Sequence, residues 1–292
     1  MKILLACDAS EHSKAVVSET IKSPWPATSK FKVISIVDNS FLGQAPAPKL
    51  LESAQAVVKA CTEQLRAGLP SQEVLDGQVI TGHPKSEIIK FAEMWPTDLL
   101  IVGSRGLKGL KRHMLGSVSS AILSAVTCSV RIARQQPAPS SSNGKGRILV
   151  ALDDSEFSDH VVSRITSRPW TDGTEFLFVT ALPSLTDYLG ELQDSHEISA
   201  LEGLRRQQAA GAETHLKEVV SLIQNQLPKA SAKYEIVDGD PREAVVEKAK
   251  EWGATLTVTG SKGKNWIDRV LIGSVSEAVA TWSNCSVEVV KK

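Results

Sequence analysis

The stretch Gly103-Ser-Arg-Gly106, followed by nine residues and then Gly116-Ser117, occurs again as Gly260-Ser-Lys-Gly263, nine residues and Gly273-Ser274. In both copies an apolar run leads into the first glycine, and an amphipathic segment follows the last one. This pattern predicts a strand, a glycine-rich loop and a helix. Glycines let the backbone approach a ligand closely, and the free N–H groups at a helix start attract anions. Each loop is therefore typical of a phosphate site.

The repeat extends beyond these loops over nearly the whole chain of 292 residues. Lys2-Ile-Leu-Leu-Ala-Cys-Asp8 aligns with Arg147-Ile-Leu-Val-Ala-Leu-Asp153 at an offset of 145 positions. Further on the offset is 157, as between Cys128-Ser-Val130 and Cys285-Ser-Val287. The second copy therefore carries a net insertion of 12 residues, which we place between about 183 and 230.

A repeat of this length indicates a duplicated domain, because each half is long enough to bury a core of its own. We expect one nucleotide-binding domain at residues 1–134 and a second at 147–292. The stretch between them, 135–146, is rich in Pro, Ser and Gly and lacks large apolar residues, so we expect a flexible linker there.

Composition excludes several classes of partner. The chain has 33 basic and 33 acidic residues, so no bulk field draws it to nucleic acid or to an anionic membrane. No apolar run approaches the roughly 18 residues that a membrane-spanning helix needs. The four cysteines show no CxxC spacing, which favours reduced, buried thiols in a cytoplasmic protein. They are Cys7, Cys61, Cys128 and Cys285.

Strands and helices alternate in the predicted element order, which favours a parallel sheet covered by helices on both faces. In the first copy we expect strands at 3–7, 31–37, 74–81, 98–102 and 129–133, and helices at 10–22, 50–67, 85–95 and from 116 or 117 onward. Ligands bind such sheets beyond the carboxyl ends of the strands. The glycine loops follow one of those ends.

Three features together resemble the universal stress protein family in its tandem form. They are an aspartate just after the first strand, at Asp8 and Asp153, the spacing G-x2-G-x9-G-[S/T], and the closing Cys-Ser-Val segment. The resemblance implies an α/β fold of two tandem Rossmann-like domains, each a five-stranded parallel sheet of order 3-2-1-4-5. It also implies adenine-nucleotide binding and pairing through the last strand. A tandem chain would form that pair internally as a pseudo-dimer, and a homodimer of chains is the further alternative.

Carried over position by position, the resemblance implies one nucleotide site in each copy. In the first copy the site residues are Asp8, Val37, Gly103, Gly106, Gly116, Ser117 and Val118. In the second copy they are Asp153, Leu182, Gly260, Gly263, Gly273, Ser274 and Val275. A carboxylate accepts hydrogen bonds from ribose hydroxyls and repels phosphates, so we expect Asp8 and Asp153 at the sugar. The backbone near Val37 or Leu182 would pair with adenine.

Each assignment has a structural alternative. The glycines can serve turns alone, Ser117 and Ser274 can cap their helices, and the two aspartates can cap the first helix of each copy. Basic residues in the loops either clamp phosphates or are solvated. They are Arg105, Lys108, Lys111, Arg112 and His113 in the first copy, and Lys262, Lys264 and Arg269 in the second.

The second copy departs from the family pattern in two ways. Asp98, which precedes the fourth strand, is replaced by Thr255. The 12-residue excess lies near the second strand and helix, on the side expected to hold adenine. This segment either shields the second nucleotide or plugs its pocket.

No familiar catalytic motif is present. The sequence has no G-x4-G-K-[S/T], HExxH or G-x-S-x-G motif and no zinc-type Cys/His spacing. We therefore expect no catalytic residue and no metal held by the protein. The expected function is binding of ATP, ADP or AMP, with Mg2+, by a cytoplasmic stress-response regulator that acts through nucleotide-dependent stability or an unidentified protein partner. The alternatives are a slow ATP hydrolase or nucleotidyl-transfer enzyme, and a pseudo-dimeric scaffold with a degenerate second site.

Overall fold

The computed structural model describes residues 1–39, 47–106, 114–135, 146–153, 155–184, 195–262 and 272–292. The first half contains β1 (Lys2–Ala6), α1 (Glu11–Lys22), β2 (Lys30–Val37), α2 (Pro48–Gly68), β3 (Glu73–Val74), β4 (Gln78–Thr81), α3 (Pro84–Met94), β5 (Leu99–Gly103), α4 (Ser117–Ala125) and β6 (Ser129–Ala133). The second half contains β7 (Arg147–Ala151), α5 (Glu156–Thr166), β8 (Glu175–Leu182), α7 (Ser195–Gln226), β9 (Ser231–Asp238), α8 (Pro241–Trp252), β10 (Leu256–Gly260), α9 (Ser274–Trp282) and β11 (Ser286–Val290).

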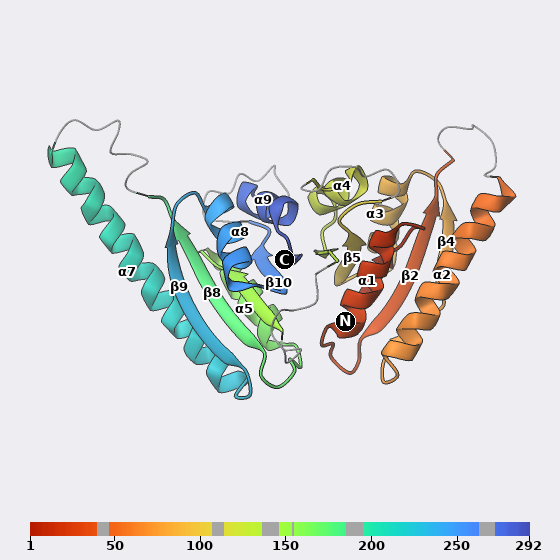
Figure 1. The fold of residues 1–292 in the computed structure, drawn as a ribbon, viewed down its shortest axis with the longest axis horizontal. Coiled ribbons are helices and arrows are strands. Elements are labelled where there is room, and N and C mark those ends of the chain that lie inside the picture. The colour runs from red at the N-terminus through yellow and green to blue at the C-terminus, as the bar shows by residue number, and fades with distance from the viewer. Residues whose placement is uncertain (40–46, 107–113, 136–145, 154, 185–194, 263–271) are drawn as a thin grey trace.

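The two halves share one sheet (Figure 1). In the described residues its strands follow the order β3-β2-β1-β5-β6-β11-β10-β7-β8-β9, and β4 also pairs with β2. Each half thus has the predicted order 3-2-1-4-5, with parallel neighbours throughout. The exception is the junction of the halves, where β6 and β11 pair antiparallel. The expected intrachain pseudo-dimer is therefore present.

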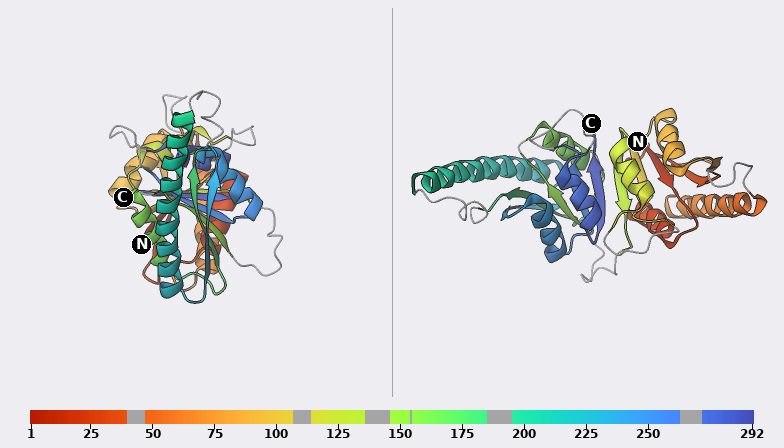
Figure 2. Two further views of the ribbon diagram at one scale, coloured as in Figure 1. Left: turned by 90° about the vertical axis from the view of Figure 1, so that its left-hand side faces the viewer. Right: turned by 90° about the horizontal axis from the view of Figure 1, so that it is seen from above.

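Helices cover both faces of the sheet, as Figure 2 shows from two further directions. On one face, α1 and α2 enclose a core of the first half, and α5 and α7 enclose a separate core of the second half. On the other face a single core includes residues of α3, α4, α8 and α9 and continues across the junction of the halves. The central strands are buried on both faces, which explains apolar runs such as Ile3-Leu4-Leu5 in β1, where all three residues have no exposed surface.

The third strand of the first half differs from the prediction. One strand was expected over 74–81, but the structure has β3 and β4, which both pair with β2 and are separated at residues 75–77. Helix α2 passes close to this break: a Cβ on Gly77 would lie 2.3 Å from the Val58 side chain. The strand is broken where the helix leaves no room for a side chain.

We expect Gly77→Ala to destabilise the fold by about 1–3 kcal/mol, the usual cost of overpacking. The Val58→Ala variant removes the methyl group that the new Cβ would meet. The loss caused by Gly77→Ala should therefore be smaller in the Val58→Ala background. Urea unfolding of the two single variants and the double variant measures this coupling. Equal losses in both backgrounds would contradict the explanation.

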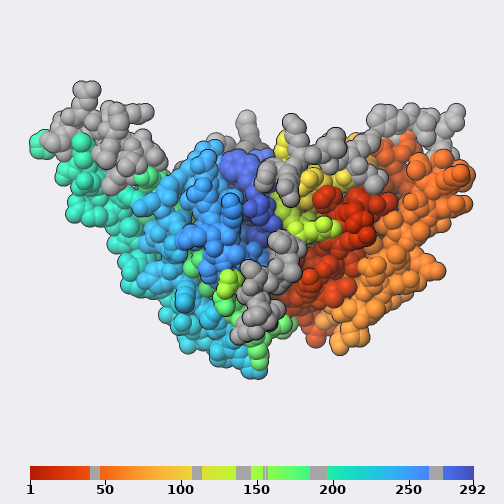
Figure 3. Space-filling view, viewed as in Figure 1, coloured from red at the N-terminus to blue at the C-terminus, as the bar shows by residue number. Residues whose placement is uncertain are grey.

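The excess residues of the second half are found mostly in α7, which has 32 residues where the corresponding α2 has 21. Figure 1 shows α2 and α7 at opposite outer sides of the molecule, with α7 extending past the end of β9, and Figure 3 shows the same two sides in a space-filling view. The insertion therefore lengthens one outer helix without changing the strand order.

Candidate functional site

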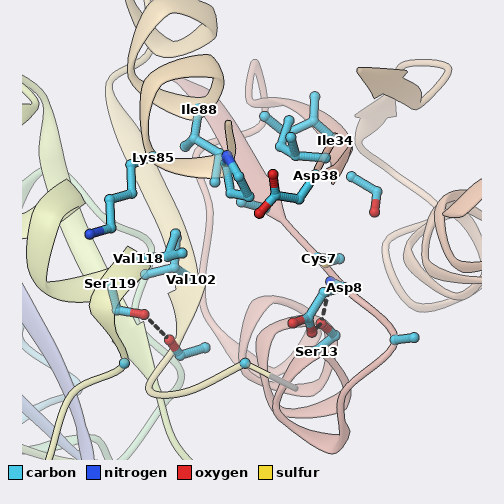
Figure 4. Close-up of a pocket in the computed structure, with 18 of the residues that line it drawn as sticks. Cys7, Asp8, Ser13, Ile34, Asp38, Lys85, Ile88, Val102, Val118 and Ser119 are labelled. Carbon is cyan, nitrogen blue, oxygen red and sulfur yellow. Dashed lines mark hydrogen bonds between the residues drawn. The ribbon is translucent and has the colours of Figure 1, made fainter. Parts of the chain in front are cut away.

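The site residues expected in the first half gather at the carboxyl ends of its strands. They line one cavity of about 760 Å³, a volume typical of small-molecule sites, which span roughly 300–1,000 Å³. All seven are in its wall: Asp8, Val37, Gly103, Gly106, Gly116, Ser117 and Val118. Figure 4 shows Asp8 and Asp38 across the cavity from Val102 and Val118. The cavity thus combines the ends of β1, β2 and β5 with the start of α4.

The loop after β5 folds back at its last glycine. The Gly116 N–H donates to the Ser104 carbonyl at 2.8 Å, and the Ser119 hydroxyl donates to the Gly103 carbonyl at 2.7 Å (Figure 4). These bonds hold the start of α4 beside the end of β5. Gly116 occupies the N-cap position and supplies no side-chain cap. The first N–H groups of α4, at Ser117 and Val118, are therefore available to an anion in the cavity.

This geometry bears on two of the interpretations left open by the sequence. Ser117 is the first helical residue and not the N-cap, so the capping interpretation of Ser117 is wrong. The glycines serve different purposes. A Cβ on Gly103 would lie 2.8 Å from the Cβ of His12, so Gly103 is required for the packing of α1. A Cβ on Gly106 would lie 2.9 Å from Asp8 Oδ2, and therefore at the cavity wall.

Asp8 has both a structural role and a free oxygen. Its Oδ1 accepts hydrogen bonds from the Ser10 N–H (3.0 Å), the Ser10 hydroxyl (2.5 Å) and the Ser13 hydroxyl (2.9 Å). Asp8 thus shapes the turn that precedes α1, as the capping alternative proposed in part. The other oxygen, Oδ2, faces Gly106 and has no hydrogen-bond partner in the described part of the chain. It is available to accept from a ligand hydroxyl.

The cavity also contains residues that sequence reasoning missed. Helix α2 contributes an apolar wall, and charged side chains come from the residue after β2 and from α3. These residues include Leu50, Ala54, Val57, Asp38 and Lys85. Asp38 follows Val37 directly, so the rule that ligands bind beyond strand ends was the signal for it. Nothing in the sequence marks the apolar residues of α2, because they have the spacing of an ordinary core-facing helix.

Cys7 lines the cavity, and its surroundings favour the protonated thiol. A hydrogen bond with Cys61 and burial raise the pKa of the Cys7 thiol well above its usual range. The group is a thiol at neutral pH, whereas the reactive form is the thiolate. All four cysteines are free, which agrees with the prediction of unpaired thiols.

The second half repeats the same local geometry. Asp153 Oδ1 accepts from the N–H and hydroxyl of Ser155, and the Gly273 N–H donates to the Ser261 carbonyl at 2.7 Å. Ser274 is the first residue of α9, so the N-cap interpretation is wrong here too. A Cβ on Gly273 would lie 3.5 Å from its nearest neighbour, an ordinary contact, so this loop is less crowded. Gly263 lies outside the described residues.

The long helix α7 alters the adenine side of the second half. Arg205 of α7 donates to the Pro183 carbonyl at 2.5 Å and forms an ion pair with Asp238. Pro183 directly follows Leu182 at the end of β8 and corresponds to Asp38 of the first half. A protein contact therefore occupies this strand end in the second half.

The basic residues of the loops are only partly described. Arg105 lines the first cavity. Lys262 lies over the Phe157 ring, 5.5 Å from its centroid. The remaining members fall outside the described residues: Lys108, Lys111, Arg112, His113, Lys264 and Arg269. The choice between phosphate clamp and solvated charge therefore stays open for them.

The sequence model of the universal stress protein family matches residues 1–134 and again residues 145–291. The chain belongs to the universal stress protein family. A universal stress protein of Mycobacterium tuberculosis is 28% identical over 203 residues, which cover 67% of this chain and 64% of that protein. One from Synechocystis is 27% identical over 155 residues, covering 51% of this chain and 99% of its own length. The chain thus spans somewhat less than two thirds of its mycobacterial relative.

Solved structures show the same fold. The crystal structure of a universal stress protein from Archaeoglobus fulgidus superposes with a TM-score of 0.63 at 24% identity, covering 100% of this chain and 96% of that one. A putative universal stress protein from Pseudomonas aeruginosa gives a TM-score of 0.63 at 15% identity, covering 99% and 92%. The α/β fold predicted from the repeat is confirmed.

The departure from the family pattern at Thr255 does not affect the site of this universal stress protein. Asp98 Oδ2 accepts from the Lys2 N–H at 2.7 Å, and Thr255 Oγ1 accepts from the Arg147 N–H at 3.0 Å. Both side chains thus satisfy the first N–H of the neighbouring strand. They lie just before β5 and β10, at the amino ends of the strands, whereas the glycine loops follow the carboxyl ends. The replacement conserves a structural contact.

Two absences complete the description of the site. In the part of the chain that the structure describes, no cluster of three or more His, Cys, Asp or Glu side chains is arranged to hold a metal ion. Among the same residues, no helix has the length and apolar character needed to cross a membrane.

Proposed function

We propose that the first half of this universal stress protein binds an adenine nucleotide, and that occupancy of this site regulates the stability or the partner binding of the chain. The observation that carries the proposal is the cavity, which joins an apolar end to an uncapped helix start. An adenine ring packs against apolar side chains, and a phosphate group binds the free N–H groups at a helix start. The family resemblance of the glycine spacing supports the same ligand class.

The wall of the cavity suggests which residues hold each part of the nucleotide. Adenine fits between the end of β2 at Val37 and the apolar wall of α2. The ribose hydroxyls fit beside Asp8, whose Oδ2 is available as an acceptor. The phosphates fit at Gly106 and Gly116 and at the start of α4.

Mg2+ would reach this site with the nucleotide. The described residues offer no ready-made cage for a metal, and Mg2+ is usually held by one or two carboxylates together with substrate phosphates. The residues present therefore fit a nucleotide that brings its own cation. Arg105 and Lys85, both in the cavity wall, supply positive charge for the phosphates.

We propose that the second half binds nucleotide more weakly or not at all. Arg205 engages the Pro183 carbonyl at the strand end where adenine would lie. The inserted segment was expected either to shield a nucleotide in the second half or to plug its pocket, and this contact favours the second interpretation. The chain then has one working site and one degenerate copy.

Adding ATP to the purified chain is expected to raise its melting temperature. A ligand at 100 times its dissociation constant stabilises the native state by about 2.7 kcal/mol, which corresponds to a shift of about 5–10 °C, because each kcal/mol shifts the melting temperature by about 2–4 °C for domains of about 150–250 residues. Differential scanning fluorimetry with ATP, ADP and AMP, with GTP as the control for base recognition, measures the shift. No response to any adenine nucleotide at millimolar concentration would refute the proposal.

We expect ATP turnover to be slower than about one per minute, far below the roughly 1–100 s⁻¹ of kinases. Backbone N–H groups hold the ground state, but hydrolysis also needs a base for the attacking water. Asp8 Oδ1 is already saturated by three donors, and Asp8 lies at the proposed ribose end. Phosphate release with Mg2+ measures the rate, with Gly116→Val as the control for contaminating ATPase. A rate above about one per second that disappears in the control would support the hydrolase alternative.

A further inference from the structure

The junction of the two halves carries an approximate twofold symmetry that the sequence repeat makes visible. In the antiparallel pair of β6 and β11, Arg131 lies directly opposite Glu288. Because the repeat offset is 157, these two residues occupy the same position in the two copies. They therefore lie at the symmetry centre. If either half paired with a second copy of itself in this register, the residue at this position would face itself.

Arg131 and Glu288 are both completely buried and are directly bonded. The Arg131 Nε and Nη2 atoms donate to Glu288 Oε2 at 2.9 and 2.6 Å. Two copies of the first half would bring two buried guanidinium groups together at this point. Two copies of the second half would bring two buried carboxylates together. Like charges directly opposite each other destabilise a strand pair, and burial makes the repulsion stronger.

Two groups around this pair follow the same complementarity, whereas a third, Glu19 of the first half, lies 3.4 Å from Arg131 and would accompany it in either kind of pair. Arg168 donates to Glu288 within the second half, and at the equivalent position of the first half Ser23 accepts from Arg131 at 2.5 Å. The indole ring of Trp25 lies under both arginines, with its centroid 5.1 Å from Arg131 Cζ and 5.7 Å from Arg168 Cζ. Only a pair of unlike halves stacks both guanidinium groups on this ring.

Other contacts at the junction do not discriminate between partners. Arg134 donates to carbonyls at the end of α9, including that of Ala280, and Lys291 donates to the Leu123 and Val126 carbonyls at the end of α4. Arg134 and Lys291 are equivalent in the repeat, and both are cations at the carboxyl end of a helix. Self-paired halves would keep this kind of contact. It supplies affinity, whereas the Arg131 and Glu288 position supplies selectivity.

We propose that the β6 edge of the first half is an interaction surface whose specific partner is the β11 edge of the second half, and that Arg131 and Glu288 exclude a second copy of either edge. This pairing rule goes beyond nucleotide binding. If each edge paired with the same edge of another molecule, the chains would assemble into open-ended oligomers. A chain with complementary edges closes on itself instead.

A cleavage assay tests this rule on the full chain. A recognition sequence for a site-specific protease is inserted between Gln135 and Gly146, the chain is cut, and native mass spectrometry after dilution measures the fraction of halves that remain paired. Glu288→Arg with Arg168→Ser gives the second half the junction residues of the first. Arg131→Glu with Ser23→Arg does the reverse. The fourth protein carries all four changes.

The cut wild-type chain and the cut quadruple variant are expected to remain as pairs of one first half and one second half. Each of the two double variants should dissociate at least about tenfold more readily, which corresponds to about 1.4 kcal/mol. Double variants that stay paired as tightly as the wild type would overturn the proposal. The quadruple variant keeps the test decisive even if a double variant fails to fold. If its halves separate, complementarity at this position does not determine pairing, and the proposal is wrong.

Discussion

The Gly116→Val variant is expected to lose at least about 100-fold in ATP affinity, a difference of about 2.7 kcal/mol. A Cβ at this position would lie 3.2 Å from the Cα of Arg105, so the loop must move to accommodate it. The branches of valine would also fill the space in front of the first N–H groups of α4, where the phosphates are proposed to bind. The backbone dihedrals of Gly116, φ −64° and ψ 154°, are open to any residue, so the loss arises from space and not from strain.

The matched control is Gly273→Val, at the equivalent position of the second half. Its Cβ has only ordinary contacts, and Arg205 already occupies the neighbouring strand end. Calorimetry of the wild type should show one nucleotide per chain, unchanged in Gly273→Val and lost in Gly116→Val. Melting temperatures without ligand verify that both variants fold. A stoichiometry of two in the wild type that falls by one in each variant would contradict the proposal of a single working site.

The sequence identified residues that line the first cavity where their position depends on backbone and spacing. The glycine loops, the aspartates and the ends of the parallel strands follow from local pattern, because parallel strands bring their carboxyl ends to one edge. The predicted strand over Ser129–Ala133 is confirmed to the residue. Pattern also located the insertion, which the structure places mainly in α7. Sequence reasoning therefore recovers the features that are determined by neighbouring positions in the chain.

Side-chain contacts between distant segments were not predicted. The apolar wall that Leu50 and Val57 of α2 contribute to the cavity has the periodicity of any amphipathic helix. Arg205 has no local signal for its contact with Pro183, 22 positions earlier in the chain. The charge pair of Arg131 and Glu288 was also missed, because a single charge in a strand usually indicates an exposed position. The repeat offset of 157 contained a signal for this pair, since it aligns opposite charges at one position of two pairing strands.

Replacing Glu288 by Gln is expected to destabilise the chain by about 3–5 kcal/mol at neutral pH, the usual effect of breaking a buried ion pair. The variant leaves the guanidinium groups of Arg131 and Arg168 buried without their common carboxylate. Glu277→Gln, an exposed substitution on α9, is the matched control and should change the free energy of unfolding by less than about 0.5 kcal/mol.

The effect of Glu288→Gln should become smaller as the pH falls. Burial alone would raise the pKa of the Glu288 carboxyl, but Arg168 and Arg131 outweigh burial and lower that pKa from 4.5 to about 2. A pKa that is lower in the folded state means that ionised Glu288 stabilises the fold above about pH 4.5 and that this contribution, about 3 kcal/mol, is lost as the pH falls towards 2.

Glu19 acts in the opposite direction, because burial raises its pKa and its protonation then favours the folded state. Glu19 is present in both proteins, and its coupling to Glu288 is part of the difference between wild type and variant. Urea unfolding at about pH 7, 4 and 3 should show the two free energies of unfolding converging on acidification. Parallel curves would mean that the charge of Glu288 does not hold the two halves together.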